Sequence, residues 1–290
     1  MLTRHLYITI FSFYCLFFLS SCNTRPAGHR MVTVSILPQK YMVEKIAGDY
    51  LQVNVMIPSG MNPSTCDLNT GQLKNLYDSD LCFTIGHLPF EHTHLYPVLE
   101  KQKNIPVINH SENIHLLNGS CGHSHESPDG IDPHIWLSPA NVKIMATTIF
   151  QTLSKHYPGQ QELFEKNYHL FVQELDRIDR QTQLALAPKQ EKTFLIYHPA
   201  LTYFAADYGL KQISIEEDGK EPSPEHLKEI IDLAIEKDIR LILIQSQFDK
   251  SNAQSIARQI NGKVISIDPL AENWEEEINK LIRLLGEMLH

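Results

Sequence analysis

Histidine is the residue type in this chain that most clearly indicates a chemical function. Eight of its fifteen histidines fall between His87 and His134. The stretch 122–136 reads GHSHESPDGIDPHIW, and its last histidine, His134, follows an Asp-Pro pair. Because neutral imidazole is a common ligand of transition metals, this concentration of histidines predicts that the chain binds a metal ion.

Four side chains are candidate ligands of one metal site, namely His134, His198, Asp268 and, as a fourth ligand, His87. Each could instead be a solvated strand-end residue, and Asp268 before Pro269 could simply form a turn. Two imidazoles and a carboxylate fit a tetrahedral zinc site best, while Mn²⁺ and Fe²⁺ remain alternatives.

The histidines of the loop, His123 and His125, are a different case. Gly, Ser and Pro residues surround them, which predicts a mobile loop. We therefore expect these two histidines to be weak metal contacts outside the tight site.

The elements that must position the candidate ligands alternate between strand and helix. In the first half, the patterns predict strands over 31–37, 51–57, 80–85 and 105–109, and helices over 39–47, 70–78, 91–101 and 138–157. In the second half, they predict strands over 193–198, 211–216, 240–245 and 263–268, and helices that begin near Pro199, Ser223, Asp249 and Glu272. Such alternation is typical of a mostly parallel sheet covered by helices.

One long helix is predicted between the two halves. Apolar residues recur at helical spacing through 158–188, whereas a flexible linker would be rich in Gly and Ser. We predict an α/β protein with a lobe over 31–157 and a lobe over 189–290, each a mostly parallel four-stranded sheet with flanking helices, joined by this helix.

This topology predicts that the four candidate ligands meet. In open parallel sheets, ligands bind beyond the carboxyl ends of the strands. His198 and Asp268 end predicted strands, His87 follows one, and His134 follows the loop after the fourth strand. The four side chains should therefore point toward one cleft between the lobes.

The N-terminus, residues 1–22, has the pattern of a processed segment. One early cation, Arg4, precedes an apolar run that is too short for a membrane-spanning helix. We expect a secretory signal, so that the mature chain works outside the cytoplasm. LSSC resembles the lipobox of bacterial lipoproteins, which implies that Cys22 is lipidated and anchors the chain to a membrane; a non-lipidated signal is the alternative.

Charge and cysteine usage exclude other partners and sites. The net charge is −9 and there is no basic cluster, so we expect no nucleic-acid partner. Cys66, Cys82 and Cys121 are widely spaced and form neither a CxxC pair nor a zinc-finger pattern.

Over nearly all of residues 31–289, the sequence resembles the metal-binding substrate-binding lipoproteins of ABC importers for zinc and manganese, the cluster A-I or ZnuA/TroA-like group. The resemblance rests on the His-rich loop and on GMNPSTCDLNTGQL (60–73), IGHLPFE (85–91), DPHIWLSP (132–139), YHPALTYFAADYGL (197–210), QSQF (245–248) and ISIDPL (265–270). It implies that the chain captures a divalent transition metal, zinc in particular, and delivers it to an ABC permease with its cytoplasmic ATPase.

The resemblance also implies that His134, His198 and Asp268 are three of the family's metal ligands. The family's first ligand is a His directly after the Pro of a G-x-x-P-H motif. Here GMNP is followed by Ser64, and a serine hydroxyl is a poor zinc ligand. The fourth ligand therefore differs from the family pattern.

Four candidates can fill that fourth position: His87, Cys66, Asp67 or a water molecule. His87 follows Gly86 at the carboxyl end of a predicted strand, from which it can reach the cleft. Cys66 is compatible with zinc, but the direction of its side chain is open. Water in the fourth position is as good an interpretation as His87.

Two other function classes stay open. A zinc ion with three protein ligands and a bound water also describes a catalytic centre, in which Glu216 or Glu217 could act as the base. The chain has neither HExxH nor GxSxG, so we expect no enzyme. A metal buffer or adhesin that does not pass its metal on is the third class.

Overall fold

The computed structural model describes residues 30–61, 66–119, 130–217 and 219–289. The predictions for Cys22, His123 and His125, and the position of Ser64, lie outside the described residues. The chain divides into two units after Arg30, and the second unit holds every helix and strand of the described residues.

The first lobe is built on a parallel sheet with the strand order β2-β1-β3-β4. Its strands are β1 (Met31–Val34), β2 (Gln52–Val55), β3 (Leu81–Thr84) and β4 (Val107–Asn109). Its helices are α2 (Leu37–Ala47), η1 (Gly48–Tyr50), α3 (Thr70–Asp78), η2 (Glu91–Leu95), α4 (Tyr96–Leu99), η3 (Ile135–Leu137) and α5 (Pro139–His156).

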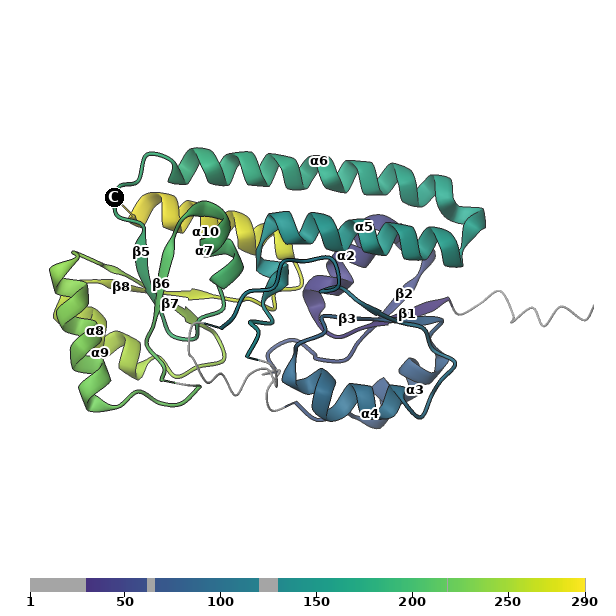
Figure 1. Ribbon diagram of the computed structural model, residues 1–290, viewed down its shortest axis with the longest axis horizontal. Helices are drawn as coiled ribbons and strands as arrows, with labels where there is room; N and C mark the ends of the chain where they lie inside the picture. Colours follow the sequence, from purple (N-terminus) through teal and green to yellow (C-terminus); the bar gives the residue numbers. More distant parts are fainter. Residues whose placement is uncertain (1–29, 62–65, 120–129, 218, 290) are drawn as a thin grey trace, which may run out of the picture. The chain divides into compact units, whose positions relative to one another are not determined.

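The second lobe repeats this plan with the strand order β6-β5-β7-β8, again all parallel. Its strands are β5 (Thr193–Ile196), β6 (Lys211–Ser214), β7 (Leu241–Gln245) and β8 (Lys263–Ile267). Its helices are α7 (Thr202–Tyr208), α8 (Pro224–Glu236), α9 (Ser251–Ile260) and α10 (Trp274–Met288). Figure 1 shows the two sheets with helices on their faces. The predicted α/β fold with two lobes is confirmed.

Alternating side chains of the second sheet enter two different apolar cores. Leu195, Ile242 and Ile244 pack in the core beneath α8 and α9. Their neighbours Phe194, Ile196, Leu241 and Leu243 enter the larger core, which also holds residues of the first lobe and of α10. This follows from the period of two along a strand, and it explains why these strands read as continuous apolar runs.

The helix α6 (Gln161–Leu186) joins the lobes, as predicted. It has 26 residues, which corresponds to roughly 39 Å at 1.5 Å per residue. It runs beside α5 and α10 in Figure 1, and it packs on α2, α5 and α10. Its buried apolar residues, among them Phe164, Phe171 and Leu175, belong to the larger core that both lobes share.

The helix predicted over 91–101 is not a regular α-helix along its whole length. Its first part, η2, is a π-helix, and the α-helix that follows ends at Leu99. Tyr96 N–H bonds to Glu91 C=O, five residues back, and the next residue, Pro97, has no N–H to continue a regular ladder.

Among the described residues, no helix is both long and apolar enough to cross a membrane.

The imidazole of His110, directly after β4, is buried in the first lobe. It stacks on Phe83 with ring centroids 5.0 Å apart, and its Nδ1 lies 3.0 Å from Gln39 Nε2. Gln39 Oε1 accepts from Ser35 N–H at 2.9 Å, so Nε2 of Gln39 donates to His110. Burial lowers the pKa of His110 to about 3, and the ring is therefore neutral in the folded chain at neutral pH.

His110 should make folding stability fall as pH falls. The unfolded chain takes up the proton near pH 6.5, whereas the folded chain does not take it up until about pH 3, so acid favours unfolding between these values. From pH 7.5 to 5.5, His110 should remove about 1.4 kcal/mol from the free energy of unfolding. Urea unfolding of the wild type and of His110→Gln measures this contribution, and equal pH dependence in the two proteins would contradict it.

Candidate metal centre

Two of the predicted ligands, His134 and His198, lie face to edge in the structure. Their ring centroids are 5.2 Å apart, and each side chain is 12% exposed. His134 directly precedes η3, and His198 follows β5 by two residues. The fold thus brings an imidazole from each half of the chain to one place, with a small part of each ring open to solvent.

A buried carboxylate orients His134. Asp132 Oδ1 accepts from the backbone N–H of His134 at 2.8 Å and lies 2.9 Å from its Nδ1. Burial raises the pKa of Asp132, but the contacts with His134 and Thr202 together lower it by more, so that the pKa lies below its ordinary value. Because an ionised carboxylate can only accept, Nδ1 of His134 carries the proton, and Nε2 is the nitrogen that can bind a metal.

His198 is oriented in the same way by Glu216, whose Oε1 lies 2.9 Å from His198 Nδ1. Gln245 holds the backbone of His198 on both sides: its Nε2 donates to His198 C=O at 2.6 Å, and its Oε1 accepts from His198 N–H at 3.3 Å. The ring of Phe248 stacks on His198 with centroids 5.6 Å apart. These contacts fix both the backbone and the ring of His198.

Asp132, Glu216 and Gln245 are functional candidates that the sequence analysis missed or assigned otherwise. Glu216 was considered as a catalytic base, whereas the structure pairs it with His198. The parallel register contains the signal: Ile196 pairs with Ser214 and with Leu243, so the positions two residues further on, 198, 216 and 245, adjoin one another. Strand pairing must be known before this signal can be read.

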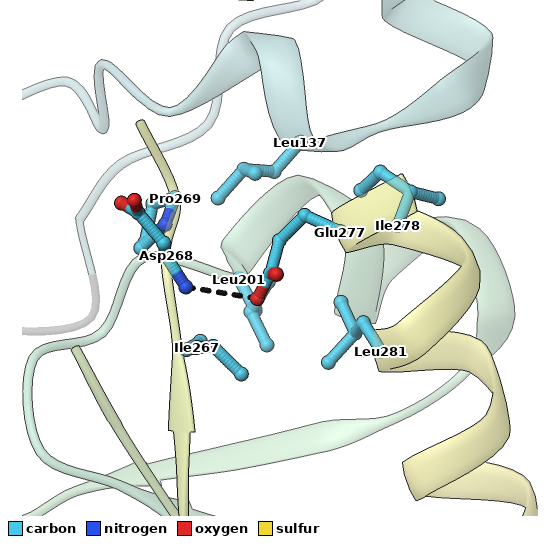
Figure 2. Close-up of a pocket in the computed structure, with 8 residues that line it drawn as sticks. All are labelled: Leu137, Leu201, Ile267, Asp268, Pro269, Glu277, Ile278 and Leu281. Atoms are coloured by element: carbon cyan, nitrogen blue, oxygen red, sulfur yellow. Dashed lines mark hydrogen bonds between the residues drawn. The ribbon is translucent and has the colours of Figure 1, made fainter. Parts of the chain in front are cut away.

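Asp268 follows β8, as predicted, but its carboxylate accepts a hydrogen bond within the turn that it begins. Oδ1 accepts from Leu270 N–H at 3.0 Å and lies 3.5 Å from Gln247 Nε2. The backbone N–H of Asp268 donates to Glu277 at 2.9 Å. Figure 2 shows the Asp268 carboxylate directed away from the side chain of Glu277 and from Leu281.

The cavity in Figure 2 is not a metal site. Its volume is about 10 Å³, which is room for one water molecule at most. Apart from Asp268 and Glu277, its lining side chains are apolar: Leu137, Leu201, Ile267, Pro269, Ile278 and Leu281. A metal ion here would lack enough donor atoms.

His87 lies in a tightly held segment after β3. Gly86 has a φ of 105°, and a Cβ at this position would collide with the Asn109 side chain, so only glycine fits. The buried carboxylate of Glu91 accepts from Ile85 N–H and Gly86 N–H, both at 2.7 Å. The backbone that carries His87 is therefore fixed by the first lobe.

The two other protein candidates for the fourth ligand, Cys66 and Asp67, differ in how far they are exposed to solvent. Cys66 is buried, and burial raises the pKa of its thiol. The side chain of Asp67 is 91% exposed and lies 3.9 Å from His94 Nε2. In the part of the chain that the structure describes, no three His, Cys, Asp or Glu side chains lie close enough to hold one ion. The structure brings His134 and His198 together, and it does not bring Asp268 or His87 into a ligand cluster with them.

Known proteins match this chain along almost its whole length. A profile of the family described as "Zinc-uptake complex component A periplasmic", ZnuA, matches residues 32–289. Zinc-binding lipoprotein AdcA of Streptococcus pneumoniae is 26% identical over 279 residues, which cover 91% of this chain and 55% of that longer protein. High-affinity zinc uptake system protein ZnuA of Bacillus subtilis is 26% identical over 262 residues, covering 86% of this chain and 81% of its own. A crystal structure of ZnuA has a TM-score of 0.82 and 34% identity, covering 90% of this chain and 99% of that chain.

The carboxylate behind His198 generates a prediction for metal affinity. If His198 binds a metal ion, Glu216→Gln keeps an acceptor for Nδ1–H but removes the carboxylate that strengthens the imidazole as a ligand, so metal binding should weaken about tenfold. Glu217→Gln is the matched control, because Glu217 is the next residue and its carboxylate accepts instead from Ser223 N–H at 3.2 Å. Titration against a competing chelator measures both affinities, and an equal effect of the two substitutions would exclude the role of Glu216.

Proposed function

Because the chain belongs to the zinc-uptake complex component A family, we propose that it captures zinc outside the cytoplasmic membrane and delivers it to an ABC permease with its cytoplasmic ATPase. The family profile supports this over residues 32–289. The names of the relatives, a zinc-binding lipoprotein and a zinc uptake protein, support zinc as the cargo. Mn²⁺ and Fe²⁺ are the alternative cargoes, because a set of nitrogen and oxygen donors accepts them too.

One observation carries the proposal: two imidazoles lie face to edge, and each is held at Nδ1 by a buried carboxylate. This pairing of histidine with carboxylate is what metal-binding histidines almost always have. It leaves Nε2 of His134 and of His198 as the zinc donors. The carboxylates also strengthen the two rings as metal ligands.

Asp268 is the proposed third ligand. Its Oδ1 is held by Leu270 N–H, with Gln247 Nε2 nearby, and the second oxygen of the carboxylate, Oδ2, can bind the ion while Oδ1 keeps these partners. The fourth ligand is either His87 of the first lobe or a water molecule. His123 and His125 are proposed as weak additional contacts, which deletion of residues 119–129 would remove without loss of the tight site.

The structure favours binding over hydrolysis. Glu216, the nearest candidate for a general base, lies against Nδ1 of His198 and is 4% exposed. Glu217 accepts a backbone hydrogen bond from Ser223, which leaves it occupied within its own loop. A hydrolase screen of the zinc-loaded protein tests the enzyme alternative, and zinc accumulation by cells that lack the chain separates an importer from a metal buffer or adhesin.

Histidine substitutions should weaken zinc binding in a graded way. His134→Ala and His198→Ala each remove a ligand, so affinity should fall by more than about 100-fold, beyond the effect of losing an outer contact. If His87 is the fourth ligand, His87→Ala should weaken binding about tenfold or more, and each tenfold loss corresponds to about 1.4 kcal/mol. His169→Ala, on the exposed side of α6, should have no effect. Competition with a chelator is the measurement, and unchanged affinity of His87→Ala would assign the fourth position to water.

We also propose that Cys22 is lipidated and that the lipid holds the mature chain at a membrane surface. The support is the LSSC sequence at residues 19–22 and the lipoprotein named among the relatives. Labelling of cells with a radioactive fatty acid should mark the wild type and not Cys22→Ser. Label retained in the variant would refute the lipid anchor.

A further inference from the structure

The two tryptophans of the chain, Trp136 and Trp274, hold two parts of the proposed site together. They are 1% and 2% exposed. Trp136 Nε1–H donates to Pro269 C=O at 2.7 Å, and Trp274 Nε1–H donates to Trp136 C=O at 2.7 Å. Trp136 lies two residues after His134, and Pro269 directly follows Asp268. The two indoles therefore link the segment of one proposed ligand to the turn of another.

Further hydrogen bonds fasten the same segment, residues 131–138, to α7. Tyr203 OH donates to Asp132 C=O at 2.8 Å and accepts from Leu117 N–H at 3.2 Å. Ser138 Oγ donates to the carboxylate of Asp207. Although the sequence analysis assigns this segment to the first lobe, its hydrogen bonds reach α7 and the loop between β8 and α10 in the second.

The His87 segment is held from the other side. Glu91 binds the N–H groups of Ile85 and Gly86 and also accepts from Ser35 Oγ–H. His92 Nε2 lies 3.0 Å from Gly86 C=O. These partners all belong to the first lobe, whereas the hydrogen bonds of the His134 segment reach the second lobe.

We propose that Trp136 and Trp274 are positioning residues, which hold His134 in register with Asp268 before zinc binds. The segments of His134 and Asp268 are then joined before zinc binds, although their side chains do not form a ligand cluster with His198 in the described residues. Separating the two segments would leave two buried indole N–H groups without acceptors, which is unfavourable, so the link persists in both states. Donors fixed in advance lose less freedom when the ion binds. The inference rests on the proposed zinc-binding function.

Hydrogen exchange of the two indoles tests the link directly. A nitrogen-15 spectrum contains two indole N–H signals, because the chain has two tryptophans, and Trp136→Phe assigns them. Both signals should exchange slowly with solvent in the zinc-free and in the zinc-loaded protein. Exchange of either signal at the rate of an exposed indole in the zinc-free protein would overturn the inference, whether or not the chain binds zinc.

Zinc affinity tests the consequence for the site. Trp274→Phe keeps an aromatic side chain, although a smaller one, and removes the hydrogen bond, so it should weaken zinc binding about tenfold, a loss of about 1.4 kcal/mol. Tyr157→Phe is the matched control: it removes a hydrogen bond of 2.7 Å to Asp80, at the amino end of β3 and away from the site, and should leave affinity unchanged.

A double substitution distinguishes a positioning role of Trp274 from a general loss of rigidity in the protein. If Trp274 acts through Asp268, then Asp268→Ala should weaken binding less in Trp274→Phe than in the wild type. Strictly additive effects, or wild-type affinity in Trp274→Phe, would overturn the inference. If the wild-type chain binds no zinc, the proposed function fails instead, and the indole exchange still decides whether the link exists.

Discussion

The proposed site depends on the contact between an imidazole Nδ1–H and a buried carboxylate. A histidine ring has two nitrogens, and its tautomer and direction are defined only when one nitrogen has a fixed partner. Asp132 and Glu216 supply that partner for His134 and His198. Each carboxylate is itself buried and needs its own support, so the requirement extends from the two rings into the sheet and the loops around them.

The second sheet meets this requirement through strand pairing. Because β5 lies between β6 and β7, the residues just beyond its carboxyl end have neighbours on both sides. Glu216 comes from one side and Gln245 from the other, and together they hold the ring and the backbone of His198. The first lobe uses the same strategy with Glu91, which binds two consecutive N–H groups after β3. Burial raises the pKa of Glu91, while these N–H groups and Ser35 lower it.

The sequence allowed much of this fold to be predicted. Strand and helix periodicity located the eight strands to within a few residues, and the rule for parallel sheets brought His134 and His198 to one region. The π-helix at Glu91–Leu95 was not predicted, because its hydrogen bonds depend on local competition around Pro97. The carboxylates behind the histidines were missed because they follow from strand register. The lobe boundaries at 157 and 189 stay predictions, because residues that precede α5 bind to the second half of the chain. Tyr203 of α7 donates to Asp132 C=O, and Trp136 donates to the backbone carbonyl of Pro269 in the loop after β8.

The location of the only two tryptophans has an optical consequence. All indole emission of the chain originates from Trp136 and Trp274, within the link between the His134 segment and the Asp268 turn. The ring of His134 lies 5.1 Å from that of Trp136, so an ion bound at the proposed site would change the surroundings of this indole. The chain thus carries a built-in fluorophore beside its proposed cargo, and occupancy can be followed by ultraviolet light without any attached dye.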